Sequence, residues 1–159
     1  MKRWILLCAV ALIALCVVCC APSQENETVS LSLEYRGAVL TVGMSESEAI
    51  SALGDDWTLS ESESCAGDGL DRMYTYPSLR LYVFAPADGQ ATVTSVAYTD
   101  DGAVTVDGLH IGCAVGEVTM ALGEPDEQSE TRLCYYGDND QLTFAVRDGR
   151  VSGILLSGK

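Results

Sequence analysis

Basic residues, histidine and phenylalanine are scarce in this chain. Its 159 residues include 9 Lys and Arg, 1 His and 2 Phe against 23 Asp and Glu, which gives a formal net charge of −14. A chain this negative is repelled by phosphates, which argues against nucleic acid as a partner. A single histidine without a recognisable nucleophile motif gives no support to acid–base or nucleophilic catalysis, so the protein is predicted not to be an enzyme.

Metal ligands in a recognisable spacing are also missing. Paired acidic residues at 55–56, 100–101 and 138–140 supply oxygen atoms of the kind that Ca²⁺ binds, but they fall at expected turns and lack a twelve-residue loop closed by Glu. His110 and Cys113 are close in sequence but form no zinc-ligand pattern. We therefore predict no metal and no cofactor, with a calcium-binding surface domain as an alternative.

The amino terminus reads as an export signal. Lys2 and Arg3 precede an uncharged apolar run over 4–18, and a polar stretch over 23–27 follows. This order is typical of a secretory signal and a flexible tether. We expect residues 1–20 to form the signal segment, and residues 21–36 to form the tether and a first strand region.

Residues 17–20, Val-Val-Cys-Cys, resemble the bacterial lipobox. The resemblance implies that Cys20 receives a lipid with acyl chains such as palmitate, which would anchor the domain to the outer face of the cell membrane. Cys19 stands where Gly or Ala is usual, so the modified residue can be either cysteine. Cleavage after Ala21 and an uncleaved signal anchor are alternatives. Cleavage before Cys20 would leave 7 basic and 23 acidic residues, a charge of −16.

Three cysteines remain beyond the signal: Cys65, Cys113 and Cys134. In an exported domain this odd number allows one disulfide and one free thiol, and Cys65 with Cys134 is the first pairing to test. Three unpaired cysteines acting as small core residues are the alternative.

An internal repeat organises the rest of the chain. Residues 42–54 match residues 111–123 at Gly, Glu, Ala, Leu and Gly with a constant offset of 69 residues. Each copy predicts a short helix that ends at a glycine. Ser45 and Glu48 have the spacing of a capping box, so Glu48 is expected to be structural.

Alternating segments follow each predicted helix. They cover 73–76, 79–85 and 92–98 in the first copy, and 132–136, 142–147 and 151–156 in the second. Period-two alternation between turn residues predicts strands. We therefore expect an α+β fold with two tandem repeats, at 37–102 and 103–159, each a helix plus a three-stranded antiparallel meander, with both helices on one face of the sheet.

The second copy also carries a family resemblance. Ile-Gly at 111–112, Ala-Leu-Gly-Glu-Pro at 121–125 and the strand pair at 142–154 resemble uncharacterised lipoproteins of clostridia and their relatives, as do 64–67, 74–76 and 99–101 in the first copy. The resemblance spans 39–156. More distantly, the plan is similar to the β-lactamase-inhibitor-protein fold and to small outer-membrane assembly lipoproteins. Such a likeness implies protein binding, and it is an analogy of fold alone.

The strand over 79–85 offers the candidate binding surface. Leu79, Leu81 and Val83 alternate with Arg80, Tyr82 and Phe84, so the second set is expected on the face away from the helices, with Tyr135 nearby. Tyr and Arg are enriched in binding hot spots. Packing of these rings inside the protein is the alternative. The predicted function is a non-enzymatic module that binds a protein or ligand at the cell envelope, and a small acidic envelope hydrolase is a further alternative.

Overall fold

A computed structural model describes residues 31–105 and 107–159 of the chain. The predicted signal segment 1–20, its Cys20, and the tether up to residue 30 lie outside the described residues. Strands make up 48% and helices 12% of the structure. The protein is therefore mainly β, and its architecture follows from how the strands pair.

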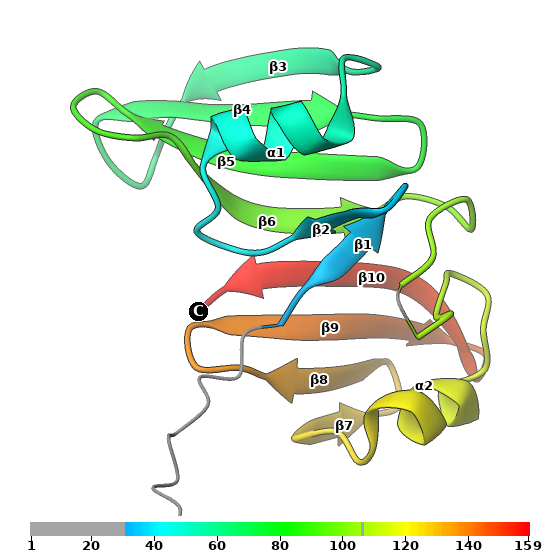
Figure 1. The fold of residues 1–159 in the computed structure, drawn as a ribbon. Coiled ribbons are helices and arrows are strands. Elements are labelled where there is room, and N and C mark those ends of the chain that lie inside the picture. Colours follow the sequence, from blue (N-terminus) through cyan, green and yellow to red (C-terminus); the bar gives the residue numbers. More distant parts are fainter. Residues whose placement is uncertain (1–30, 106) are drawn as a thin grey trace, which may run out of the picture.

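Eight strands form one antiparallel sheet (Figure 1). In spatial order they are β3 (Thr58–Glu63), β4 (Gly69–Thr75), β5 (Leu79–Pro86), β6 (Thr92–Tyr98), β10 (Arg150–Gly158), β9 (Asp140–Arg147), β8 (Arg132–Tyr136) and β7 (Glu127–Ser129). The two halves of this sheet meet where β6 pairs with β10, from Ser95 opposite Ser157 to Tyr98 opposite Ile154. Strand pairing is thus continuous from one edge to the other.

The predicted fold class is wrong. An α+β protein of two helix-plus-three-stranded-meander repeats was expected, whereas the chain forms one large eight-stranded sheet with two helices and is mostly β. The expected strand count was too low because β3 and β7 were missed. Every residue of both strands is exposed, so neither shows the apolar alternation by which a half-buried strand is found in a sequence.

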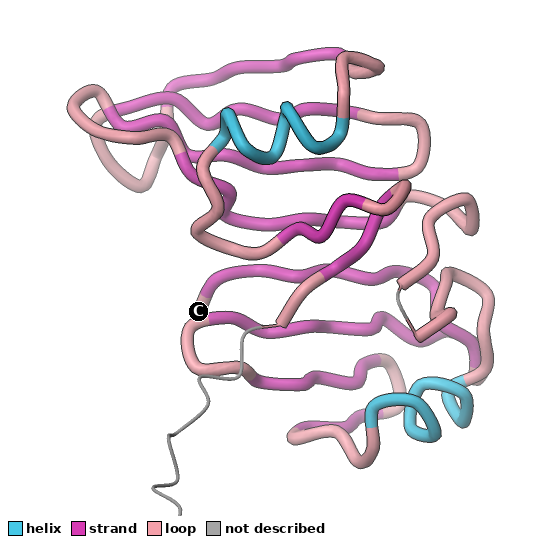
Figure 2. The backbone as a smooth tube through the Cα atoms, in the orientation of Figure 1, coloured by secondary structure: helices cyan, strands magenta, loops and turns pink. Residues whose placement is uncertain are grey.

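A two-stranded hairpin and two short helices cover one face of the sheet (Figure 2). The hairpin consists of β1 (Leu33–Tyr35) and β2 (Ala38–Leu40), and the helices are α1 (Glu46–Leu53) and α2 (Val115–Leu122). Both strands of the hairpin, Ala49 of α1 and Val118 of α2 belong to one buried cluster with the inward-facing residues of the sheet. The core is therefore a single layer between the sheet and these three elements.

Each helix begins and ends as its local sequence predicts. Ser45 Oγ accepts a hydrogen bond from Glu48 N at 3.3 Å, and Glu48 Oε2 accepts one from Ser45 N at 3.2 Å, which confirms the capping box. The Ser45 hydroxyl also donates to Glu48 Oε2, and this bond, followed by the one from Ser45 N, lowers the pKa of the Glu48 carboxyl. Gly54 and Gly123 end the two helices with φ of 79° and 82°, a region that favours glycine.

Strands β3 and β7 lie at the two edges of the sheet. β3 reads Thr-Leu-Ser-Glu-Ser-Glu and pairs along its whole length with β4 only. Because each edge strand pairs on one side alone, the acidic residues Glu61 and Glu63 lie beside unpaired backbone groups.

Candidate binding face

The sheet face opposite the core presents the predicted surface residues of β5. Leu79, Leu81 and Val83 are buried under the hairpin and helices, while Arg80 is exposed and Tyr82 and Phe84 are half-buried on the other face. This division follows from the alternation of side chains along a strand. The structure therefore brings Arg80, Tyr82 and Phe84 together on what we call the open face.

Small side chains form the middle of the open face. A shallow groove of about 480 Å³ crosses β5, β6, β10 and β9, and its lining includes Tyr82, Ser95, Ala97, Thr143, Ala145, Gly153 and Leu155. In register, Tyr82 lies opposite Ser95, Ala97 opposite Leu155, and Leu155 opposite Thr143. The Tyr82 ring borders the groove and short side chains form its floor, so side chains of a binding partner could enter it.

The polar groups of the open face are available for binding. Among the described residues, the Arg80 guanidinium and the Tyr82 hydroxyl take part in no hydrogen bond or ion pair, while the backbone carbonyl of Tyr82 accepts a bond from Thr94 Oγ1 at 3.2 Å. Pairing also places Arg132 and Arg147 on this face, since Arg132 lies opposite Ala145 and Arg147 is two residues beyond it. Hence the open face carries three arginines, with Asp71 opposite Phe84 and Glu127 paired with Arg132 as its acidic neighbours.

Tyr135 does not join this surface. It lies on β8 facing the core, 8% exposed, with its ring edge-on to Phe144 and its hydroxyl donating to the Gly123 carbonyl at 3.0 Å. Burial raises the pKa of Tyr135. Because neighbours in a strand point to opposite faces, Tyr136 is the member of the pair that faces outward, and its hydroxyl donates to Glu127 at 2.6 Å.

The three cysteines of the domain are free thiols in the structure. Cys65 is exposed in the connection between β3 and β4, whereas Cys134 is buried on β8, so the strands β5, β6, β10 and β9 separate them. Adjacent strands are about 4.8 Å apart, so this separation far exceeds the span of a disulfide. The structure therefore does not bring Cys65 and Cys134 together.

Candidate catalytic and metal-binding groups are dispersed. His110 lies in the loop before α2, where its Nδ1 is 3.2 Å from the Gly108 carbonyl. Within the described ranges, no three His, Cys, Asp or Glu side chains gather where they would hold a metal ion. Asp100, one of the acidic turn residues, accepts a hydrogen bond from Gly102 N at 2.8 Å, which is a turn-forming role.

An ionic cluster near α1 was not predicted from the sequence. Arg72 of β4 contacts Glu46 at 2.8 Å and Glu61 at 2.7 Å, and the Tyr74 hydroxyl donates to Glu46 at 2.6 Å. The bond to Glu61 is the main cause that raises the pKa of Arg72, and burial raises that of Tyr74 to about 12. The cluster ties the start of α1 to the outer strands. Arg72 and Tyr74 are two positions apart in β4 and therefore share a face, which was the available signal.

Comparison of the chain with protein-family models, with curated proteins and with solved structures finds no match. Among residues 31–105 and 107–159, no helix combines the length and the apolar character needed to span a membrane.

Proposed function

We propose that this protein is an extracytoplasmic lipoprotein, attached to the membrane through Cys20, whose open face binds another protein. The observation that carries the proposal is the set Arg80, Tyr82 and Phe84 beside a groove of about 480 Å³, on the side of the sheet that the protein itself leaves uncovered. Anchoring rests on the charged start, apolar run and lipobox-like cysteines of residues 1–20.

The contacts of the open face favour binding over a packing role. A buried core residue is already covered by its own chain, whereas Tyr82 and Phe84 are only half-buried and Arg80 is exposed. Tyr and Arg are the residue types that most often dominate a protein interface, because each combines a large contact area with hydrogen-bond donors. Leu155, 36% exposed, adds apolar area to the same groove.

Charge indicates the kind of partner. The chain as a whole is strongly acidic, and this field favours basic partners at long range. At the open face, however, Arg80 and Arg147 are available, so a partner that docks here would present apolar groups together with carboxylates. Arg132 already pairs with Glu127 at 3.0 Å, which leaves Arg80 as the best-placed cation beside the groove.

The anchoring part is tested by metabolic labelling with a palmitate analogue. We expect Cys20→Ser to abolish labelling and to move the protein from the membrane fraction to the soluble exported fraction. The matched control is Cys19→Ser, which should retain both the label and the membrane association. Label that is lost from Cys19→Ser and kept in Cys20→Ser would assign the lipid to Cys19, and label on neither parent nor variant would refute the anchor.

The binding part is tested by site-specific photocrosslinking in cells that produce the anchored protein. A photoreactive residue at Ala97, on the groove floor, should give a discrete crosslinked species, while the same group at Val39, 50% exposed on the hairpin, should not. Arg80→Glu and Tyr82→Ala should each reduce the Ala97 product several-fold. Equal crosslinking at both positions, or no response to these substitutions, would contradict the proposal.

A further inference from the structure

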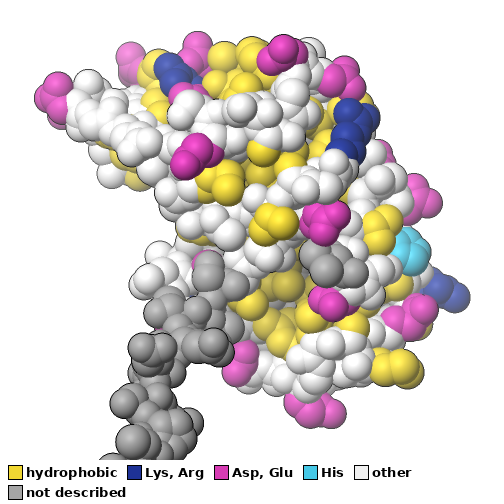
Figure 3. Space-filling view, in the orientation of Figure 1, with side chains coloured by type: hydrophobic (Ala, Val, Ile, Leu, Met, Phe, Trp, Pro, Cys, Tyr) yellow, Lys and Arg dark blue, Asp and Glu magenta, His cyan; other side chains and the backbone are white. Residues whose placement is uncertain are grey.

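A second hollow lies on the covered face of the sheet, between the hairpin and α2. It holds about 200 Å³ and is lined by Leu31, Ser32, Thr105, Asp107, Leu109, Leu122, Leu142 and Phe144. Figure 3 shows hydrophobic side chains at the floor of this recess, and the acidic residue of its lining is Asp107. Since it is on the side of the sheet opposite the open face, it is independent of the proposed protein-binding surface.

Two aromatic residues that pack beside α1 have no aromatic counterpart at the matching positions beside α2. Near α1, Trp57 packs edge-on against Tyr74 with ring centroids 4.9 Å apart, and Tyr35 packs against Tyr76 at 6.3 Å. The residue 69 positions after Tyr35 is Val104, which is 47% exposed and turned away from the core. Asp126 stands at the same offset from Trp57. At these two positions no ring fills the space beside α2, and the hollow remains above Phe144.

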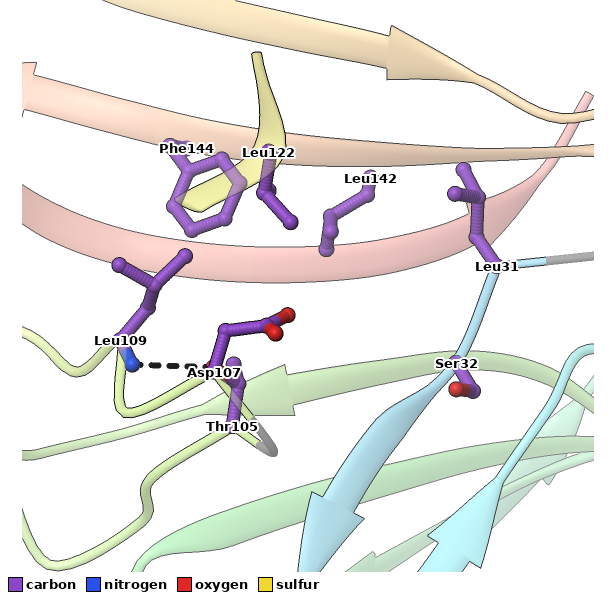
Figure 4. A pocket seen from close by; sticks show the side chains of 8 residues that line it. All are labelled: Leu31, Ser32, Thr105, Asp107, Leu109, Leu122, Leu142 and Phe144. Atoms are coloured by element: carbon purple, nitrogen blue, oxygen red, sulfur yellow. Dashed lines mark hydrogen bonds between the residues drawn. The ribbon is translucent and has the colours of Figure 1, made fainter. Parts of the chain in front are cut away.

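The walls of the hollow are chemically divided. Five of the lining side chains are apolar, and Phe144 and Leu142 form the floor. At the mouth, Thr105 Oγ1 accepts a hydrogen bond from Leu109 N at 3.0 Å, so this hydroxyl is engaged with the backbone. The exposed carboxylate of Asp107 points into the pocket in Figure 4, and it forms no ion pair or hydrogen bond with the described residues.

From this geometry we infer that the hollow binds a small primary amine that carries an aromatic or branched aliphatic group. The apolar part would lie against Leu122, Leu142 and Phe144, and the ammonium group would reach Asp107, the only charged residue among the described residues of the lining. An engineered apolar cavity of about 150 Å³ binds benzene, so a hollow of about 200 Å³ is large enough for one ring or its aliphatic equivalent. An anion is disfavoured by Asp107 and by the net charge of the protein.

The inference is tested by titrating the ¹⁵N-labelled protein with phenethylammonium chloride and following amide chemical shifts. We expect saturable shifts at Leu109, Leu122, Leu142 and Phe144, and none at Ala97 on the open face. The matched anion, 3-phenylpropionate, has a ring and a similar length, and it should bind at least fivefold more weakly. Equal affinities for the two ligands, or shifts confined to other residues, would overturn the inference.

Two variants separate the charge from the apolar hollow. Asp107→Asn should weaken phenethylammonium binding about two- to fivefold, which is the range for an exposed ion pair, whereas Asp101→Asn outside the hollow should not change it. Leu122→Phe adds volume to a half-buried lining position and should abolish the shifts at the floor. If Leu122→Phe does not fold, Ser32→Phe at the mouth serves instead. Unchanged binding in the filled variant would overturn the inference.

Discussion

The two halves of the sheet share a hydrogen-bonded frame but are packed differently. Gly43 N donates to Val93 O and Gly112 N donates to Val151 O, both at 2.8 Å. The glycines that end the helices accept a tyrosine hydroxyl in each half, Tyr76 to Gly54 at 3.3 Å and Tyr135 to Gly123 at 3.0 Å.

The differences concern what fills this frame. In the first half Ser45 caps α1 and aromatic rings fill the space beside it, whereas in the second half Ala114 stands at the cap position and a hollow remains. Backbone pairing therefore defines the path of the chain in both halves, and side-chain filling decides how firmly each half is packed.

The largest expected effect comes from truncating one core leucine in each half of the sheet and comparing the two losses of stability. Leu81 and Leu142 face the core at corresponding places on β5 and β9, but Leu81 is fully buried and Leu142 borders the hollow. Leucine-to-alanine changes in cores cost about 2–5 kcal/mol, and we expect Leu81→Ala near the upper end and Leu142→Ala near the lower. Urea unfolding measures both, with Val39→Ala as an exposed control. A greater loss for Leu142→Ala would show that the hollow is more tightly packed than its volume indicates.

The second-largest expected effect is a loss of stability at alkaline pH, when the buried tyrosines ionise. Burial raises the pKa of Tyr74 and Tyr76 to about 12, while an unfolded tyrosine ionises near pH 10. A group whose pKa is raised by folding stabilises the protein fully below the unfolded pKa, and this contribution is lost as the pH rises through the folded value. Stability should therefore fall between about pH 10 and 12, with each pKa unit worth about 1.4 kcal/mol.

This titration is followed by tyrosinate absorbance together with circular dichroism. Tyr76→Phe should lessen the alkaline loss, while Tyr82→Phe on the open face should leave it unchanged. Ionisation of all tyrosines near pH 10 in the folded protein would contradict the burial described above.

Substitutions at the two helix caps should have smaller effects on stability, and these effects should be opposite in sign. Ser45→Ala should cost about 1 kcal/mol, because the side-chain acceptor for Glu48 N is lost. Ala114→Ser should stabilise the second half by a similar or smaller amount, since it adds an acceptor where α2 has none. Unfolding in urea checks both, and Ser62→Ala in β3 is the neutral control. A stabilising Ser45→Ala would refute the cap.

Removing ion pairs should have the smallest effect on stability. Arg72 is half-buried and joins two carboxylates, whereas Arg132 is exposed and pairs only with Glu127. We expect Arg72→Gln to lower stability more than Arg132→Gln, whose effect should be close to the limit of measurement. Raising the salt concentration to about 1 M should shrink the difference, because salt screens exposed charges. An equal loss from both variants would show that the cluster adds nothing beyond a surface pair.

Local signals predicted part of this structure well. Both helices begin and end where the repeated glycines and the Ser45–Glu48 pair indicate, and the strands over 92–98 and 132–136 have the expected bounds. These features depend on neighbouring residues, so periodicity and capping chemistry reveal them.

The sequence could not predict features that depend on distant pairing. β3 and β7 are strands because β4 and β8 offer them a free edge, although their own residues are all exposed. Tyr135 is buried and Tyr136 is exposed because of which side of β8 faces the core. Two adjacent tyrosines in a sequence do not indicate which of them faces inward. The hollow near Asp107 likewise requires the relative placement of a loop, a helix and a strand.

The acidic edge strand β3 has a consequence for crowding. Molecules tethered to one surface meet at high local concentration, and an unpaired strand edge invites a neighbour to extend the sheet into an aggregate. Glu61 and Glu63 would face the like charges of an incoming copy, so the edge resists such self-association. The strand that periodicity failed to reveal thus protects this edge of the sheet against pairing with another copy.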